Sequence, residues 1–101
     1  MKTRYCVLSD AQKVDTIKLL HNSIYWLLLY KEREDPCLEG YFDVLLFKIG
    51  GFNSLLGYPT EMVEILALLE AAKVELQKGE EFNFRLYRKA ILDAESVVDR
   101  L

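Results

Sequence analysis

The sequence is poor in the residues that most often build catalytic and metal sites. Its 101 residues include one histidine, two cysteines and two prolines. The single histidine, His21, excludes every mechanism that needs two histidines, and the patterns HExxH, CxxC and Glu-x-x-His are missing. Gly50-Gly51 is followed by FNSLLG, which lacks the lysine and hydroxyl residue of a phosphate-binding loop. The sequence therefore predicts no catalytic residues, no metal ligands and no cofactor, and indicates that the chain is not an enzyme.

An excess of positive charge and a long apolar run are missing as well. The formal net charge is −3, so no global positive field attracts nucleic acid, and we expect no nucleic-acid partner. The longest apolar stretch, 24–29, is far shorter than the ~20 residues that span a bilayer, and the N-terminus lacks the apolar core of a signal peptide. Cys6 and Cys37 could form a disulfide, but we expect two buried thiols in a reducing cytosol. These absences favour a cytoplasmic protein without a membrane span.

Apolar residues are abundant instead. They make up 51% of the chain beside 29% charged residues, a combination that excludes intrinsic disorder. A chain of this length buries roughly two-thirds of its unfolded surface without the help of a metal or a disulfide. Residues 1–101 are therefore expected to form a single domain.

Apolar residues recur at spacings of three and four along most of the chain, which is the pattern of helices that pack by one face. Gly50-Gly51 is expected to end or sharply bend the second helix and to leave 52–56 as a separate short helical turn. The connections are short, which favours antiparallel neighbours. The expected fold is all-α, an antiparallel (up-down) bundle of four helices at about 10–33, 36–49, 61–78 and 84–100.

Polar residues mark the expected ends of these helices. Ser9, Asp35 and Thr60 are expected to cap the first three helices at their N-termini, and the fourth is expected to start near Asn83. Gly79 suits the position just past the end of the third helix.

The first two predicted helices carry more apolar surface than one bundle seam uses. No charged residue interrupts 24–30, so this part of the first helix has to be covered on two sides. Large aromatic side chains dominate protein interfaces because each buries a large area at low entropic cost. The expected interface therefore consists of Leu19, Trp26, Tyr30 and Phe47. A two-layer packing within one chain is the alternative use of the same surface.

Arg85, Arg88 and Lys89 form a basic patch within one turn of the last predicted helix. They lie near the N-terminus of that helix, where positive charge opposes the helix dipole. This positive charge can be balanced in two ways. Glu80-Glu81 and the acidic side of the third helix could balance it within the chain, or a bound phosphate or an acidic partner surface could do so. Three charges are too few to predict nucleic-acid binding.

The function expected from these features is that of a non-enzymatic interaction or accessory protein of the regulatory type. It would act through its apolar and aromatic helix face, as a homodimer or with another protein partner. One alternative is a bundle that binds a small apolar or anionic ligand between its helices, with Arg85 or Arg88 holding the head group. A second alternative is a divalent-metal-dependent hydrolase that uses Glu61 and Glu64, for which a second acidic pair on a facing helix is missing.

Overall fold

The computed structural model describes residues 10–56 and 60–101, and within these ranges it contains helices and no strands. The helices are α1 (Asp10–Glu32), α2 (Leu38–Leu56), α3 (Thr60–Leu76) and α4 (Phe84–Val98), with the short 3-10 helix η1 (Gly79–Glu81) between the last two. The all-α helical bundle predicted from the sequence is confirmed. None of the described helices is long and apolar enough to cross a lipid bilayer.

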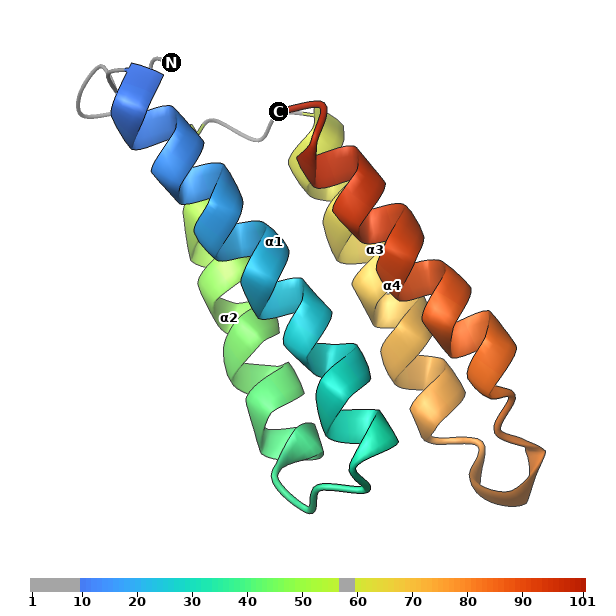
Figure 1. Cartoon of the computed structure of the whole chain (residues 1–101). Helices are drawn as coiled ribbons and strands as arrows, with labels where there is room; N and C mark the ends of the chain where they lie inside the picture. The colour runs from blue at the N-terminus through green and yellow to red at the C-terminus, as the bar shows by residue number, and fades with distance from the viewer. Residues whose placement is uncertain (1–9, 57–59) are drawn as a thin grey trace.

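The four helices form two hairpins that lie against each other (Figure 1). In the figure, each helix runs opposite to the one before it in the chain, first α1 and α2, then α3 and α4. Each helix packs against its neighbours in the chain, and the contact between α1 and α4 closes the ring. The result is an elongated molecule that measures 46 × 21 × 21 Å.

A continuous apolar core runs along the bundle axis. Every helix contributes one stripe of side chains at spacings of three and four, as the sequence predicts. The buried apolar side chains are Leu20, Ile24, Leu27, Leu28, Leu38, Phe42, Leu45, Ile49, Met62, Ile65, Leu69, Ala72, Tyr87, Ile91, Ala94, Val97 and Val98.

Two tyrosine hydroxyls attach neighbouring helices to the backbone of α1. Tyr87 of α4 is fully buried, and its hydroxyl donates to the carbonyl of Leu27 at 2.8 Å. Tyr41 of α2 is half-buried, and its hydroxyl donates to the carbonyl of Ser23 at 2.7 Å. Burial raises the pKa of Tyr87 far above its ordinary value, so the hydroxyl stays protonated and remains a donor. α1 is therefore held from two sides by hydrogen bonds as well as by apolar packing.

The expected interruption of the second helix at Gly50-Gly51 is wrong. α2 continues through both glycines to Leu56, and the only described glycine with a positive φ is Gly79. Two glycines cost the helix roughly 1 kcal/mol each relative to alanine. Burying a side chain such as Ile49 contributes about 1.5–3 kcal/mol. Asn53, one turn later, is buried too, but its Oδ1 has no hydrogen-bond partner among the described residues. The apolar packing of α2, to which Ile49 contributes directly before the glycine pair, outweighs the low helix propensity of the two glycines.

The substitution Gly51→Ala should stabilise the protein by about 0.5–1 kcal/mol. A Cβ at Gly51 would meet no atom within 4 Å, so the gain in helix propensity carries no steric cost. Gly79→Ala is the matched control: its φ of +63° should make the same change destabilising. Urea unfolding of both variants measures the two signs, and a destabilised Gly51→Ala would contradict this account of α2.

The helix ends differ in detail from the expectation. α2 begins at Leu38 rather than at Pro36, so Asp35 lies in the turn before the helix, where its Oδ1 accepts from the backbone N–H of Cys37 at 2.8 Å. Cys37 is exposed rather than buried, since it lies in the turn before α2. Thr60 is the first residue of α3 instead of preceding it, and α3 ends at Leu76, three residues before Gly79. Ser9, the expected cap of the first helix, and Cys6 lie outside the described residues.

Candidate functional site

An open groove of about 300 Å³ lies along the contact between α1 and α2. Its walls are apolar, with leucines from α1 on one side and Leu45 and Ile49 of α2 on the other. Lys48 is the one charged residue in its lining. The lining residues are Thr16, Leu19, Leu20, Ser23, Leu45, Lys48 and Ile49.

The two hydroxyl groups in this lining are engaged by the backbone of α1. Thr16 Oγ1 donates to the carbonyl of Gln12 at 2.8 Å, and Ser23 Oγ donates to the carbonyl of Leu19 at 2.7 Å. Such bonds to the carbonyl four residues earlier are a common way for a helix to satisfy a serine or threonine. The groove therefore presents mainly carbon surface, with the Lys48 ammonium as its cation.

A row of aromatic rings continues the groove toward the C-terminal end of α1. The Tyr41 hydroxyl bonds to Ser23 at the groove, and its ring meets Tyr30 edge-on at a centroid distance of 4.9 Å. Tyr30 in turn lies 5.6 Å from the ring of Trp26, and the Arg33 guanidinium carbon lies 5.5 Å from the Trp26 centroid. Groove and aromatic row together form one strip, here named the α1–α2 face.

Three of the four predicted interface residues lie on this face. Leu19 is 69% exposed at the groove, Trp26 is 39% exposed in the aromatic row, and Tyr30 is half-buried beside it. Phe47 is 84% exposed but lies two positions after Leu45, about 200° around α2. It therefore points away from the groove, and the structure does not bring it together with the other three.

The predicted basic patch is divided in the structure. Lys89 pairs with Asp93 of the same helix at 2.9 Å. Arg85 and Arg88 are exposed, and neither has an acidic partner within 4 Å among the residues of 10–56 and 60–101. The expected compensation by Glu80-Glu81 and the acidic side of α3 is therefore not seen in the described contacts.

In the described part of the chain, the carboxylates considered for a metal and the arginines considered for a ligand do not form a binding site. Glu64, one half of the carboxylate pair considered for a metal, lies 3.4 Å from the guanidinium of Arg100. Within the described ranges, no three histidine, cysteine or acidic residues are grouped so that they could hold a metal ion. A second hollow, of about 290 Å³, lies between the α1–α2 turn and the end of α3, and neither Arg85 nor Arg88 lines it or the groove.

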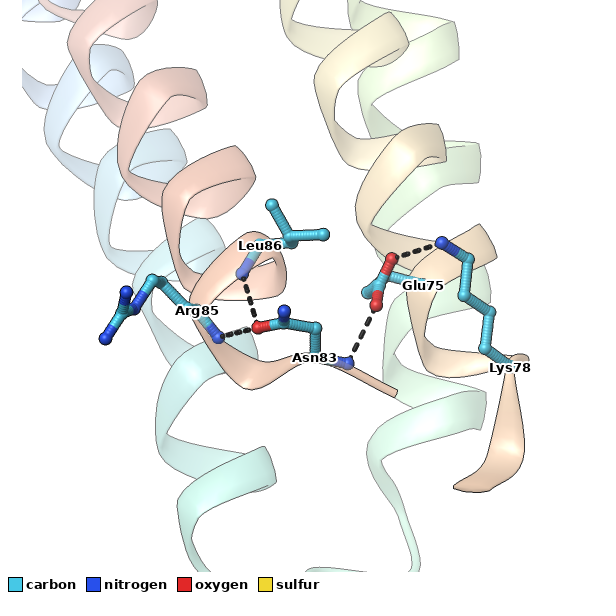
Figure 2. Close-up of polar contacts among 5 residues, drawn as sticks. All are labelled: Glu75, Lys78, Asn83, Arg85 and Leu86. Carbon is cyan, nitrogen blue, oxygen red and sulfur yellow. Dashed lines mark hydrogen bonds and ion pairs between the residues drawn. The ribbon is translucent and has the colours of Figure 1, made fainter. Parts of the chain in front are cut away.

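A buried carboxylate of α3 anchors the turn between α3 and α4 (Figure 2). Glu75 is buried; its Oε1 accepts from the backbone N–H of Asn83 at 2.8 Å, and its Oε2 pairs with Lys78 at 2.8 Å. Asn83 then caps α4, because its Oδ1 accepts from the N–H groups of Arg85 and Leu86. The helical spacing could have predicted this burial, because Glu75 comes three residues after the buried Ala72 and so lies on the inner side of α3.

Replacing Glu75 by Gln should lower the free energy of unfolding at pH 7. The bond from Lys78, followed by the bond from Asn83, lowers the pKa of Glu75 below its ordinary value of 4.5. Stabilisation from a lowered carboxyl pKa is present above the ordinary value and is lost as pH falls through the folded-state value. The difference between wild type and variant in urea unfolding should therefore shrink on acidification from pH 7 to about pH 3. Glu70→Gln, on the exposed side of α3, is the control; a pH-independent difference for Glu75 would contradict the assignment.

A second carboxylate, Glu95, is buried between α1 and α4. Its Oε2 lies 3.6 Å from Nε2 of the half-buried His21, and its Oε1 has no hydrogen-bond partner among the described residues. Burial raises the pKa of Glu95, the neighbouring His21 opposes this, and Asp99 adds to it. The sequence pattern gives the same kind of signal as for Glu75, since Glu95 follows the buried Ile91 by four residues.

The substitution Glu95→Gln should raise the free energy of unfolding at pH 8. An acid whose pKa is raised by folding destabilises the protein above that pKa, where it is ionised, and not below its unfolded value. The advantage of this variant over wild type should therefore decrease as pH falls toward 4.5, the ordinary value for this carboxyl. Thermal unfolding over this range, with the exposed Glu80→Gln as control, measures the trend. A variant less stable than wild type at pH 8 would contradict this account of Glu95.

Comparisons with protein-family models, curated proteins and solved structures give no match to this chain. The geometry of the described surface is therefore the basis for a functional argument.

Proposed function

We propose that this chain is a non-enzymatic interaction protein that binds a protein partner through the α1–α2 face. The exposed Leu19 beside an apolar groove carries the proposal. A leucine on a helix surface normally lies singly among polar neighbours, whereas this one adjoins a hollow lined by Leu20, Leu45 and Ile49. Interfaces typically centre on such apolar anchors, with aromatic residues and arginine beside them.

The size of the molecule is compatible with this use. A stable interface takes about 800 Å² from each partner. One long side of the molecule, 46 by 21 Å, is large enough to supply that area. Trp26 and Arg33, two residue types that often carry binding energy, extend the face beyond the groove. The partner is another protein or, as expected from the sequence, a second copy of the chain.

Site-specific photo-cross-linking tests the proposal in the native host. A photoreactive phenylalanine derivative in place of Leu19 should give discrete covalent adducts, because that position would lie within the interface. The same residue in place of Val74, which is exposed on α3, is the matched control and should give none of these adducts. The adduct mass separates a second copy of the 11.8 kDa chain from a different protein.

Introducing Trp26→Glu should remove the adducts from position 19 while leaving the unfolding temperature within a few degrees of wild type. Equal adducts from positions 19 and 74, or none from position 19, would overturn the assignment of this face.

A further inference from the structure

We propose that the α1–α2 face binds an acidic amphipathic helix of a partner protein. This inference rests on the proposed function and specifies the chemistry of the partner. It is carried by the charges of the face, by its length and by the nature of its walls.

The two basic residues of the face belong to the described cations without a carboxylate partner, as do Lys18, Arg85 and Arg88. Five described cations each have a carboxylate within 4 Å: Lys31, Lys73, Lys78, Lys89 and Arg100. Lys48 in the groove and Arg33 over Trp26 have no acidic partner among the described residues. Two cations beside carbon surface, without intramolecular compensation, are complementary to carboxylates on a partner.

The length of the face favours a helix over a small ligand. Leu19 and Arg33 are fourteen residues apart, which corresponds to about 21 Å along a helix. The groove occupies one end of this distance and the aromatic row the other, and the bond from Tyr41 to Ser23 connects them. An amphipathic helix lays apolar residues at spacings of three, four and seven into such a groove. Carboxylates along its edges would then reach Lys48 and Arg33.

The charges also weigh against packing this face on the same face of a second copy. A two-fold contact places the same patch on both sides, so Lys48 and Arg33 would approach a surface that carries the same cations. Asp15, one turn before Leu19, is exposed on the same side of α1 and supplies a single acid. An acidic helix offers carboxylates to both cations, whereas a second copy would bring its own Lys48 and Arg33 to this face.

A pair of synthetic peptides tests the inference with the full chain. Both are 18-residue amphipathic helices without tryptophan, with leucines at spacings of three and four; one carries glutamates on its polar side and the other lysines. Trp26, the single tryptophan of the chain, lies on the face, so its fluorescence reports docking. The glutamate peptide should bind saturably with a blue shift of the emission. The lysine peptide should bind at least about ten-fold more weakly.

Charge reversal provides the matched variants. Lys48→Glu should weaken binding of the glutamate peptide about ten-fold and improve that of the lysine peptide. Lys18→Glu is the control, because Lys18 is exposed on α1, does not line the groove and has no acidic partner among the described residues. It should change the dissociation constant less than about two-fold.

The outcomes separate this inference from the function on which it rests. Equal binding of the two peptides, lost in Leu19→Glu, would overturn the acidic partner and leave the apolar face as a binding surface. Binding that is unchanged in Leu19→Glu would overturn the face itself. Failure of the glutamate peptide to bind, or a sedimentation mass of twice 11.8 kDa that the glutamate peptide does not reduce, would also overturn the inference, the latter in favour of a second copy.

Discussion

The structure depends on covering α1 from two sides at once. The segment 24–30 has no charged residue; its Ile24, Leu27 and Leu28 are buried with both α2 and α4 as neighbours of α1, while Tyr25 and Trp26 stay exposed. The tyrosine hydroxyls of these two helices reach backbone carbonyls of α1, Tyr41 at Ser23 and Tyr87 at Leu27. A buried hydroxyl without a partner would cost about 1–3 kcal/mol, so these bonds help to define where each helix lies against α1. The same constraint leaves the outer edge of the α1–α2 contact incompletely filled, and this edge is the groove.

The polar and charged side chains are paired to different extents in different regions of the molecule. Between α3 and α4, Glu75 satisfies the backbone of Asn83, which in turn caps α4, so that one buried carboxylate links two helices. Elsewhere in the described part of the chain, five basic side chains are paired with carboxylates, whereas Lys18, Arg85 and Arg88 are not. On the α1–α2 face the hydroxyls are bonded within α1, while Lys48 and Arg33 have no acidic partner among the described residues. A surface that is apolar, elongated and locally cationic in a chain of net charge −3 is suited to a partner of opposite character.

Helix positions could be predicted from apolar spacing because a one-face stripe at three and four residues has no stable alternative in water. The start of α4 near Asn83 was predicted on local chemistry alone, whereas α2 starts two residues later than the Asp35-Pro36 pair indicated. Local propensity failed at Gly50-Gly51, where packing of α2 outweighed the cost of two glycines. The expectation of a buried thiol was also wrong at Cys37, which is exposed in the turn before α2. Of the candidate site, Leu19, Trp26 and Tyr30 were found because their spacing puts them on one side of α1, whereas Phe47 was included by its size and lies on another side.

By itself the sequence determined that this chain folds as helices, which sides of them are buried, and that the first two carry surplus apolar surface. These properties depend on neighbours three and four residues away, and a single helix geometry relates spacing to position. Only the tertiary structure decided which surplus residues meet. The groove forms only where α1 and α2 pack at a particular register. That Lys48 and Arg33 lack an acidic partner among the described residues also follows only from the packed helices. Spacing places Glu75 and Glu95 on the inner sides of their helices, and the tertiary structure supplies the atoms that cover them, which come from helices distant in the sequence.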